Sequence, residues 1–126
     1  MKSSRLLLPA LYGILAWAEV QFPAQAAATT GPELIQEGWD DAATLQANEG
    51  VALFERARKC QDADPRQADL GTAIALLDVQ PTTNENVTRS AALLQKLIDA
   101  DPNNAVGLEA RYFLARIAGT TIASLC

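Results

Sequence analysis

Asp62-Ala63-Asp64-Pro65 and Asp99-Ala100-Asp101-Pro102 are two copies of one tetrapeptide, and their proline residues lie 37 positions apart. Each copy stands between two stretches whose apolar residues recur at helical spacing. Asp is a preferred N-cap and Pro fits the first turn of a helix, so the pair can end one helix and start the next. An internal repeat of this length usually indicates stacked helix pairs, each of which buries its apolar face against a neighbour.

Apolar periodicity along the rest of the chain predicts an all-α fold of stacked antiparallel helix hairpins. No alternating run is long enough for a paired strand. Asn48-Glu49-Gly50 is expected to break the first hairpin, Asn84 or Asn86 to cap the fourth helix, and Gly119 to end the last helix. The expected helices are Glu33 to Ala47, Val51 to Gln61, Arg66 to Val79, a fourth from its cap through Ile98, and Asn103 to Ala118.

Superposing the two tetrapeptides places apolar residues on apolar residues in the segments that follow them. This agreement extends the repeat beyond the four matching letters and supports about two and a half equivalent units. The matched pairs are Ala68 with Ala105, Ala73 with Ala110, Leu76 with Phe113 and Leu77 with Leu114.

Asp101-Pro102-Asn103-Asn104-Ala105 resembles the junction between tetratricopeptide repeats, and Leu108 lies where that family prefers a large apolar residue. Residues Glu109 to Arg116 are similar to first helices of exported bacterial members. The spacing of 37 exceeds the family's 34, and generic helix hairpins with the same periodicity are a structural alternative. The resemblance implies a superhelix whose inner face, here Arg66 to Val79 and Asn103 to Ala118, grips a peptide or partner protein.

Three polar residues of the last helix, Arg111, Tyr112 and Arg116, are the contacts that the resemblance implies for such a partner. The alternative is that they are solvated arginine residues and a half-buried tyrosine. No cofactor is expected.

The N-terminus has the pattern of a secretory leader. Lys2 and Arg5 precede the apolar run Leu6 to Ala18, whose thirteen residues would span roughly 20 Å as a helix, against about 30 Å of bilayer hydrocarbon. Ala24-Gln25-Ala26 suits signal peptidase. We therefore expect a signal peptide over residues 1–26, a linker over 27–32, the helical domain over 33–119 and a tail over 120–126. The expected location is periplasmic or secreted, and the alternative is a membrane anchor formed by an uncleaved leader.

Charge and cysteine content restrict the partners. The full chain carries a net charge of −5, and loss of the leader would remove two basic residues and one acidic residue. Such a surface repels nucleic acid and anionic lipid, so we expect no nucleic-acid partner and no membrane span after leader cleavage. Cys60 and Cys126 could form a disulfide in an oxidising compartment, and the alternative is a small buried Cys60 with Cys126 as a loose end.

Several motifs of common catalytic and metal sites are missing from the sequence, and its paired carboxylates are better explained as helix-start residues. The chain has no histidine, its seven glycines stand singly, and it has no CxxC pair. Asp99, Asp101 and Asn103 match the first oxygen positions of a calcium loop, but the sixth position holds Asn104 instead of glycine and the twelfth holds Ala110. We expect no metal and no enzymatic activity.

The function expected from these features is that of an exported adaptor or scaffold, which binds a peptide or protein on a helical-repeat surface. The alternative is a fragment or structural module of a larger exported repeat protein. In that case the last predicted helix would lack a covering partner, and the module would form homo-oligomers through its incomplete end.

Overall fold

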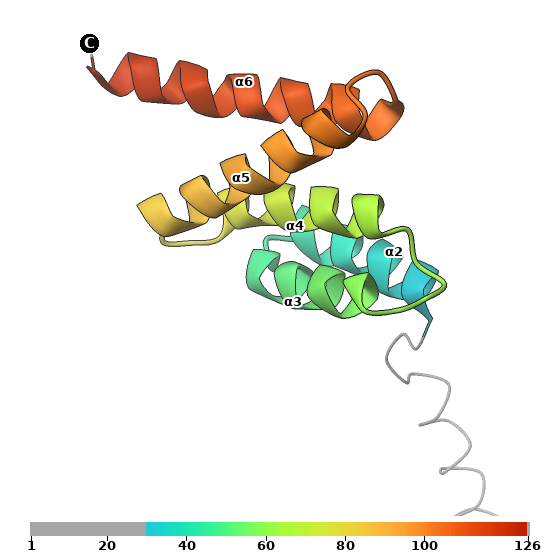
Figure 1. The fold of residues 1–126 in the computed structure, drawn as a ribbon. Coiled ribbons are helices and arrows are strands. Elements are labelled where there is room, and N and C mark those ends of the chain that lie inside the picture. The colour runs from blue at the N-terminus through green and yellow to red at the C-terminus, as the bar shows by residue number, and fades with distance from the viewer. Residues whose placement is uncertain (1–29, 126) are drawn as a thin grey trace, which may run out of the picture.

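Five α-helices and no strand make up residues 30–125, the part of the chain that the computed structural model describes (Figure 1). The all-α fold class is therefore confirmed. The helices are α2 (Gly31–Ala43), α3 (Ala47–Arg58), α4 (Pro65–Asp78), α5 (Asn84–Ala100) and α6 (Ala105–Leu125).

The helices stack in the order in which they occur in the chain. Each helix packs against the next one, α2 also contacts α4, and α4 also contacts α6. Figure 1 shows α2 and α3 at one side of the stack, α4 in the middle, and α5 and α6 beyond it. The α3–α4 and α5–α6 turns, which hold the two tetrapeptides, lie toward the same end of the stack.

Two cores fill this stack, and α4 contributes to both. The first core joins α2, α3 and α4 through Leu34, Leu53, Ala57 and Ala68. The second core joins α4, α5 and α6 through Leu70, Ala73, Leu94, Leu97, Val106 and Ala110. Because α4 is covered on more than one side, most of its residues from Ala68 to Leu76 are buried.

Side-chain caps explain where three of the helices begin. The Thr30 hydroxyl accepts from the Glu33 amide and the Glu33 carboxylate accepts from the Thr30 amide, so α2 begins at Gly31, two residues before the predicted start. Asp64 accepts from the amide of Arg66 at 2.9 Å, which confirms Asp64-Pro65 as a helix start. The predicted caps of α5 were wrong, because Thr83 accepts from the Asn86 amide at 3.1 Å.

The predicted break at Asn48-Glu49-Gly50 was also wrong, because these residues form the first turn of α3. The chain reverses at residues 44–46 instead, where the exposed Leu45 has a φ of 67°. Gly50 faces α2 so closely that a Cβ there would lie 3.0 Å from the carbonyl oxygen of Gly38. Gly50 therefore permits close packing of α2 and α3, and it does not end a helix.

The last helix is longer than predicted. Gly119 does not adopt the left-handed conformation that commonly ends a helix, since no glycine among the described residues has a positive φ. The helix continues through Leu125, so the expected end at Ala118 was wrong and residues 120–125, expected as a tail, are helical.

The two tetrapeptides start their following helices differently. α4 begins at Pro65, whereas α6 begins at Ala105, three residues after Pro102. The side chain of Asn104 accepts from the Gly107 amide at 2.8 Å. A Cβ on Gly107 would collide with the carbonyl oxygen of Asp101, so the first turn of α6 runs directly over the end of α5.

No helix among residues 30–125 combines the length and the apolarity needed to cross a membrane. The predicted signal peptide, residues 1–26, lies outside the described residues, as do residues 27–29 of the predicted linker.

Candidate functional site

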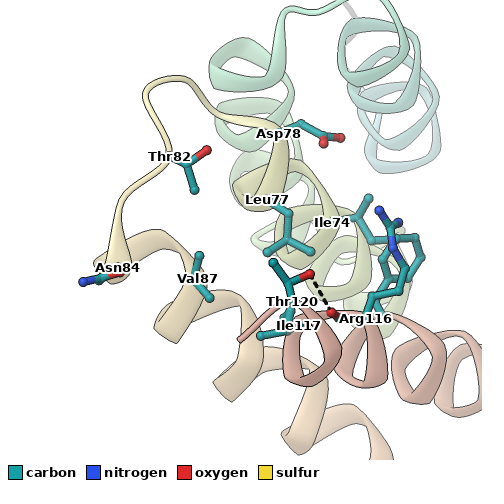
Figure 2. Close-up of a pocket in the computed structure, with 10 residues that line it drawn as sticks. Ile74, Leu77, Asp78, Thr82, Asn84, Val87, Arg116, Ile117 and Thr120 are labelled. Carbon is teal, nitrogen blue, oxygen red and sulfur yellow. Dashed lines mark hydrogen bonds between the residues drawn. The ribbon is translucent and has the colours of Figure 1, made fainter. Parts of the chain in front are cut away.

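A groove of about 360 Å³ opens between the C-terminal turns of α4, the N-terminal turn of α5 and the second half of α6 (Figure 2). Its size falls within the range of pockets that hold ligands in proteins. The lining residues are Ile74, Leu77, Asp78, Thr82, Asn84, Val87, Phe113, Arg116, Ile117 and Thr120.

The groove exists because α6 moves away from α5 toward its C-terminal end. In its first half, Val106 and Ala110 are buried against Leu94 and Leu97 of α5. Toward its C-terminus α6 diverges from α5, so that the two helices form a V (Figure 1). The apolar residues near the open end of this V are consequently only partly covered.

The groove has an apolar floor. Leu77 points from α4 toward Ile117 and Thr120 of α6, and Val87 lies on the α5 side (Figure 2). Ile74, Phe113 and Ile117 pack against the second core from their partly buried positions. This floor can take an apolar side chain of a ligand, because contact with it would remove further apolar surface from water.

Polar groups surround the floor. Asp78 and Arg116 place opposite charges on the groove wall, and Thr82 and Asn84 come from the α4–α5 connection and the start of α5. The guanidinium carbon of Arg116 lies 5.4 Å from the centre of the Phe113 ring and 5.9 Å from that of Tyr112. This contact with two rings holds the Arg116 charge beside the groove. The Thr120 hydroxyl donates to the Arg116 carbonyl at 2.9 Å, so its proton is already in use.

The three predicted partner contacts do not lie together. Arg116 lines the groove, and Tyr112 is 60% exposed, with its ring edge-to-face with Phe113 at 5.2 Å. Arg111 is exposed and does not line the groove. Sequence reasoning did not assign the floor residues Leu77, Val87 and Ile117 to a site, because their helical spacing is the same as that of core residues.

A second, smaller hollow crosses α3, α4 and α5 and is lined by residues that form ion pairs. The Asp69 carboxylate forms ion pairs with Arg58 Nε at 2.8 Å and with Lys96 Nζ at 3.6 Å. Arg89 forms an ion pair with Glu55. Only 12% of the Asp69 side chain is exposed. These pairs connect three consecutive helices, and each carboxylate already has a cationic partner. The hollow is therefore a structural contact rather than a ligand site.

The aspartates of the two tetrapeptides have structural partners. Asp62 accepts from the Gly31 amide at 3.1 Å, Asp99 from the Gln95 side chain at 2.9 Å, and Asp101 from the Asn103 amide at 3.1 Å. Over the part of the chain that the structure describes, no group of three potential metal ligands converges. These bonds give Asp62, Asp99 and Asp101 structural roles in the turns and at the end of α5.

Cys60 is half-buried after the end of α3 and packs against the first core. Its thiol lies 3.5 Å from the Arg56 carbonyl oxygen. Cys126 lies outside the described residues, so the disulfide between the two cysteines stays a prediction.

Comparison of the chain with protein-family models, with curated proteins and with solved structures gives no match. The inference of function therefore depends on the geometry of the groove and on the sequence.

Proposed function

We propose that this chain is an exported adaptor of the tetratricopeptide-like class, and that it binds a segment of a partner protein in the groove between α4, α5 and α6. The observation that carries the proposal is the groove itself. It combines a partly apolar floor with charged and amide groups on its walls, within a volume of about 360 Å³. This combination is typical of sites that recognise a ligand by one apolar anchor and a few polar contacts.

The order of helix contacts supports the repeat architecture. In a stack of helix pairs the first helix of each pair lies beside the first helix of the next pair, and here α2 contacts α4 and α4 contacts α6. The groove takes Leu77 from α4 and Ile117 from α6, the two segments expected to form the inner face. This supports placing the proposed binding surface on the inner side of the stack.

The proposed mechanism uses a preformed groove. Helices α4, α5 and α6 share one buried core, so the groove walls are already held in place before a ligand arrives. Most of the conformational entropy lost on binding is then that of the partner segment, and little is lost by the groove. An apolar side chain of the segment would contact Leu77, Val87 and Ile117, while Asp78 and Arg116 would select the charges beside that anchor.

A peptide library displayed on phage tests this proposal, with the full chain as the immobilised target. We expect enrichment of peptides that share an apolar residue, and we expect Arg116→Ala and Val87→Glu to weaken their binding by about tenfold or more. Ala92→Glu is the matched control, because Ala92 is exposed on α5 and does not line the groove. Circular dichroism verifies that each variant retains its helices.

Two results would contradict the proposal. One is the absence of any enriched peptide from several independent libraries. The other is a set of peptides that bind the Val87→Glu and Arg116→Ala variants as tightly as the unmodified chain. Mass spectrometry of the protein secreted into the periplasm addresses export separately, with a new N-terminus at Ala27 expected.

A further inference from the structure

Helix α6 has a second apolar face, which no other helix of the described chain covers. Its buried face includes Val106 and Ala110 and packs against α4 and α5. On the opposite face Leu108 is 53% exposed and Tyr112 is 60% exposed. Ala115 and Gly119 follow at exposed positions. At about 100° per residue these four residues form one line along the helix, roughly 180° from the buried face. We call Leu108, Tyr112, Ala115 and Gly119 the outer stripe.

The outer stripe is complementary in shape to a second copy of itself that runs in the opposite direction. Its first two side chains are large and its last two positions are small. In an antiparallel pair of such helices, Leu108 of one copy lies opposite Gly119 of the other, and Tyr112 lies opposite Ala115. Large residues then fill the space beside small ones. The two-fold axis makes each of these contacts, Leu108 with Gly119 and Tyr112 with Ala115, occur twice. A parallel pair would instead stack Tyr112 on Tyr112 and leave a gap at Gly119.

The charges beside the stripe fit the same arrangement. Glu109 and Arg116 lie seven residues apart on one flank of the stripe, and both are exposed. The antiparallel register that pairs Tyr112 with Ala115 brings Glu109 of each copy beside Arg116 of the other, which forms two symmetric ion pairs. On the opposite flank Arg111 lies beside the uncharged Ala118 of the other copy, and the two Arg111 residues are about 7.5 Å apart along the helix axis.

We infer that the outer stripe binds a second copy of this chain, as an antiparallel α6–α6 homodimer with Glu109–Arg116 pairs at its edges. The outer stripe shares no residue with the groove, and Glu109 and Ala115, two positions at which the dimer is tested below, also lie outside the groove. Arg116 lies at the border of both surfaces, so the dimer would place Glu109 of the second copy near the groove wall.

Charge reversal on the full chain provides the test, with sedimentation equilibrium as the measurement. In Glu109→Arg the dimer would oppose arginine to arginine in both symmetric pairs, and in Arg116→Glu it would oppose glutamate to glutamate. We expect each single variant to raise the dimer dissociation constant by about tenfold. An equimolar mixture of the two variants restores both ion pairs, so we expect a heterodimer close to the unmodified dimer in affinity.

Glu85→Arg is the matched control, because Glu85 is exposed in the first turn of α5 and lies outside the stripe. Ala115→Glu provides a second disruption at an exposed position, and thermal unfolding shows whether each variant is folded. Association that is unchanged by the single variants, or that the mixture fails to restore, would overturn the inference.

A folded monomer at a chain concentration of several hundred micromolar would also overturn it. Hydroxyl-radical footprinting of Tyr112 identifies the reason for such a result. Protection of Tyr112 in a monomer that retains residues 1–29 would show that the leader covers the stripe. Protection only in the presence of a different protein would show that the stripe serves another partner.

Discussion

The guanidinium of Arg66 donates a hydrogen bond to the side-chain oxygen of Asn104 over 3.2 Å and so connects the two tetrapeptide turns. Arg66 immediately follows the first copy, and Asn104 lies two residues after the second. The same Arg66 nitrogen lies 3.4 Å from the carbonyl oxygen of Leu97 and 3.5 Å from that of Asp101. These carbonyls belong to the end of α5, where a cation interacts favourably with the helix dipole.

Arg66→Ala should therefore destabilise the chain. The substitution removes a charged donor from the partly buried end of α5, which is expected to lower the free energy of unfolding by about 1–3 kcal/mol. Urea unfolding followed by circular dichroism measures this change. Arg111→Ala is the control, since Arg111 is exposed on α6 and its loss should change stability by less than about 0.5 kcal/mol. Equal effects of the two substitutions would show that Arg66 does not support the end of α5.

Gly71→Ala and Gly119→Ala should have opposite effects on stability, although both residues lie inside helices. A Cβ at Gly71 would collide with the ring of Phe54, which is fully buried, so we expect a loss of about 1–3 kcal/mol. Apart from its chain neighbours and the backbone of its own helix, nothing lies within 4 Å of a Cβ at Gly119. There alanine should add up to about 1 kcal/mol to the stability of the monomer through its higher helix propensity, at a chain concentration low enough to dissociate an α6–α6 dimer. Thermal unfolding of both variants measures the difference, and a stabilising Gly71→Ala would contradict the packing described here.

Ser90 should be sensitive both to loss of its hydroxyl and to added volume. Its side chain is fully buried, and its hydroxyl donates to the Ala73 carbonyl of α4 at 2.7 Å. Ser90→Ala should lower the free energy of unfolding by about 1 kcal/mol. Ser90→Leu should lower it further, by about 1–3 kcal/mol of overpacking between α4 and α5. If Ser90→Leu proved as stable as Ser90→Ala in urea, the α4–α5 contact would have to be looser than it is in the structure.

Asp41→Asn should stabilise the chain at neutral pH. Desolvation, followed by repulsion from Glu37, Glu49 and Asp40, raises the pKa of Asp41 above its ordinary value of 3.8. The folded state therefore holds a proton more tightly than the unfolded state, and the ionised carboxylate disfavours folding. The stability of the unmodified chain should fall as the pH rises from the unfolded pKa through the folded pKa, and it should stay lower above that range.

The corresponding measurement compares the two proteins by urea unfolding between pH 3 and pH 7. The advantage of Asp41→Asn should be present at pH 7 and should disappear below the unfolded pKa, where both proteins are uncharged at this position. Glu85→Gln serves as the control for removal of an exposed carboxylate outside the groove and the outer stripe. An advantage that persisted unchanged at the acid end would assign the effect to the amide group rather than to charge.

Much of the helix pattern could be predicted from local rules. Asp64-Pro65 begins α4 as expected, because an N-cap and a proline in the first turn act within a few residues of chain. Gly50 and Gly119 were misread as breaks, because glycine is also used where two helices pack closely or where nothing contacts the helix. Whether a glycine ends a helix, permits a close contact or faces open space depends on the neighbouring helix. The helix propensity of glycine contains no information about that neighbour.

The same limit applies to the groove. Arg116 was predicted as a contact from a family resemblance, and it does line the groove. Leu77, Val87 and Ile117 have the apolar spacing of core residues, so the sequence offers no sign that they are only partly covered. Their exposure results from the divergence of α6 from α5, which is a property of helix packing.

The amino-acid sequence by itself determined an all-α chain with Asp-Pro at two of its helix connections, since helix periodicity and capping are short-range effects. The tertiary structure alone decided that α6 begins after Asn104 and leans away from α5. It also decided that the same helix carries one buried face and one uncovered face. These features depend on how α6 packs against α4 and α5 and on contacts between distant segments, such as that of Arg66 with Asn104, and helical spacing does not encode them.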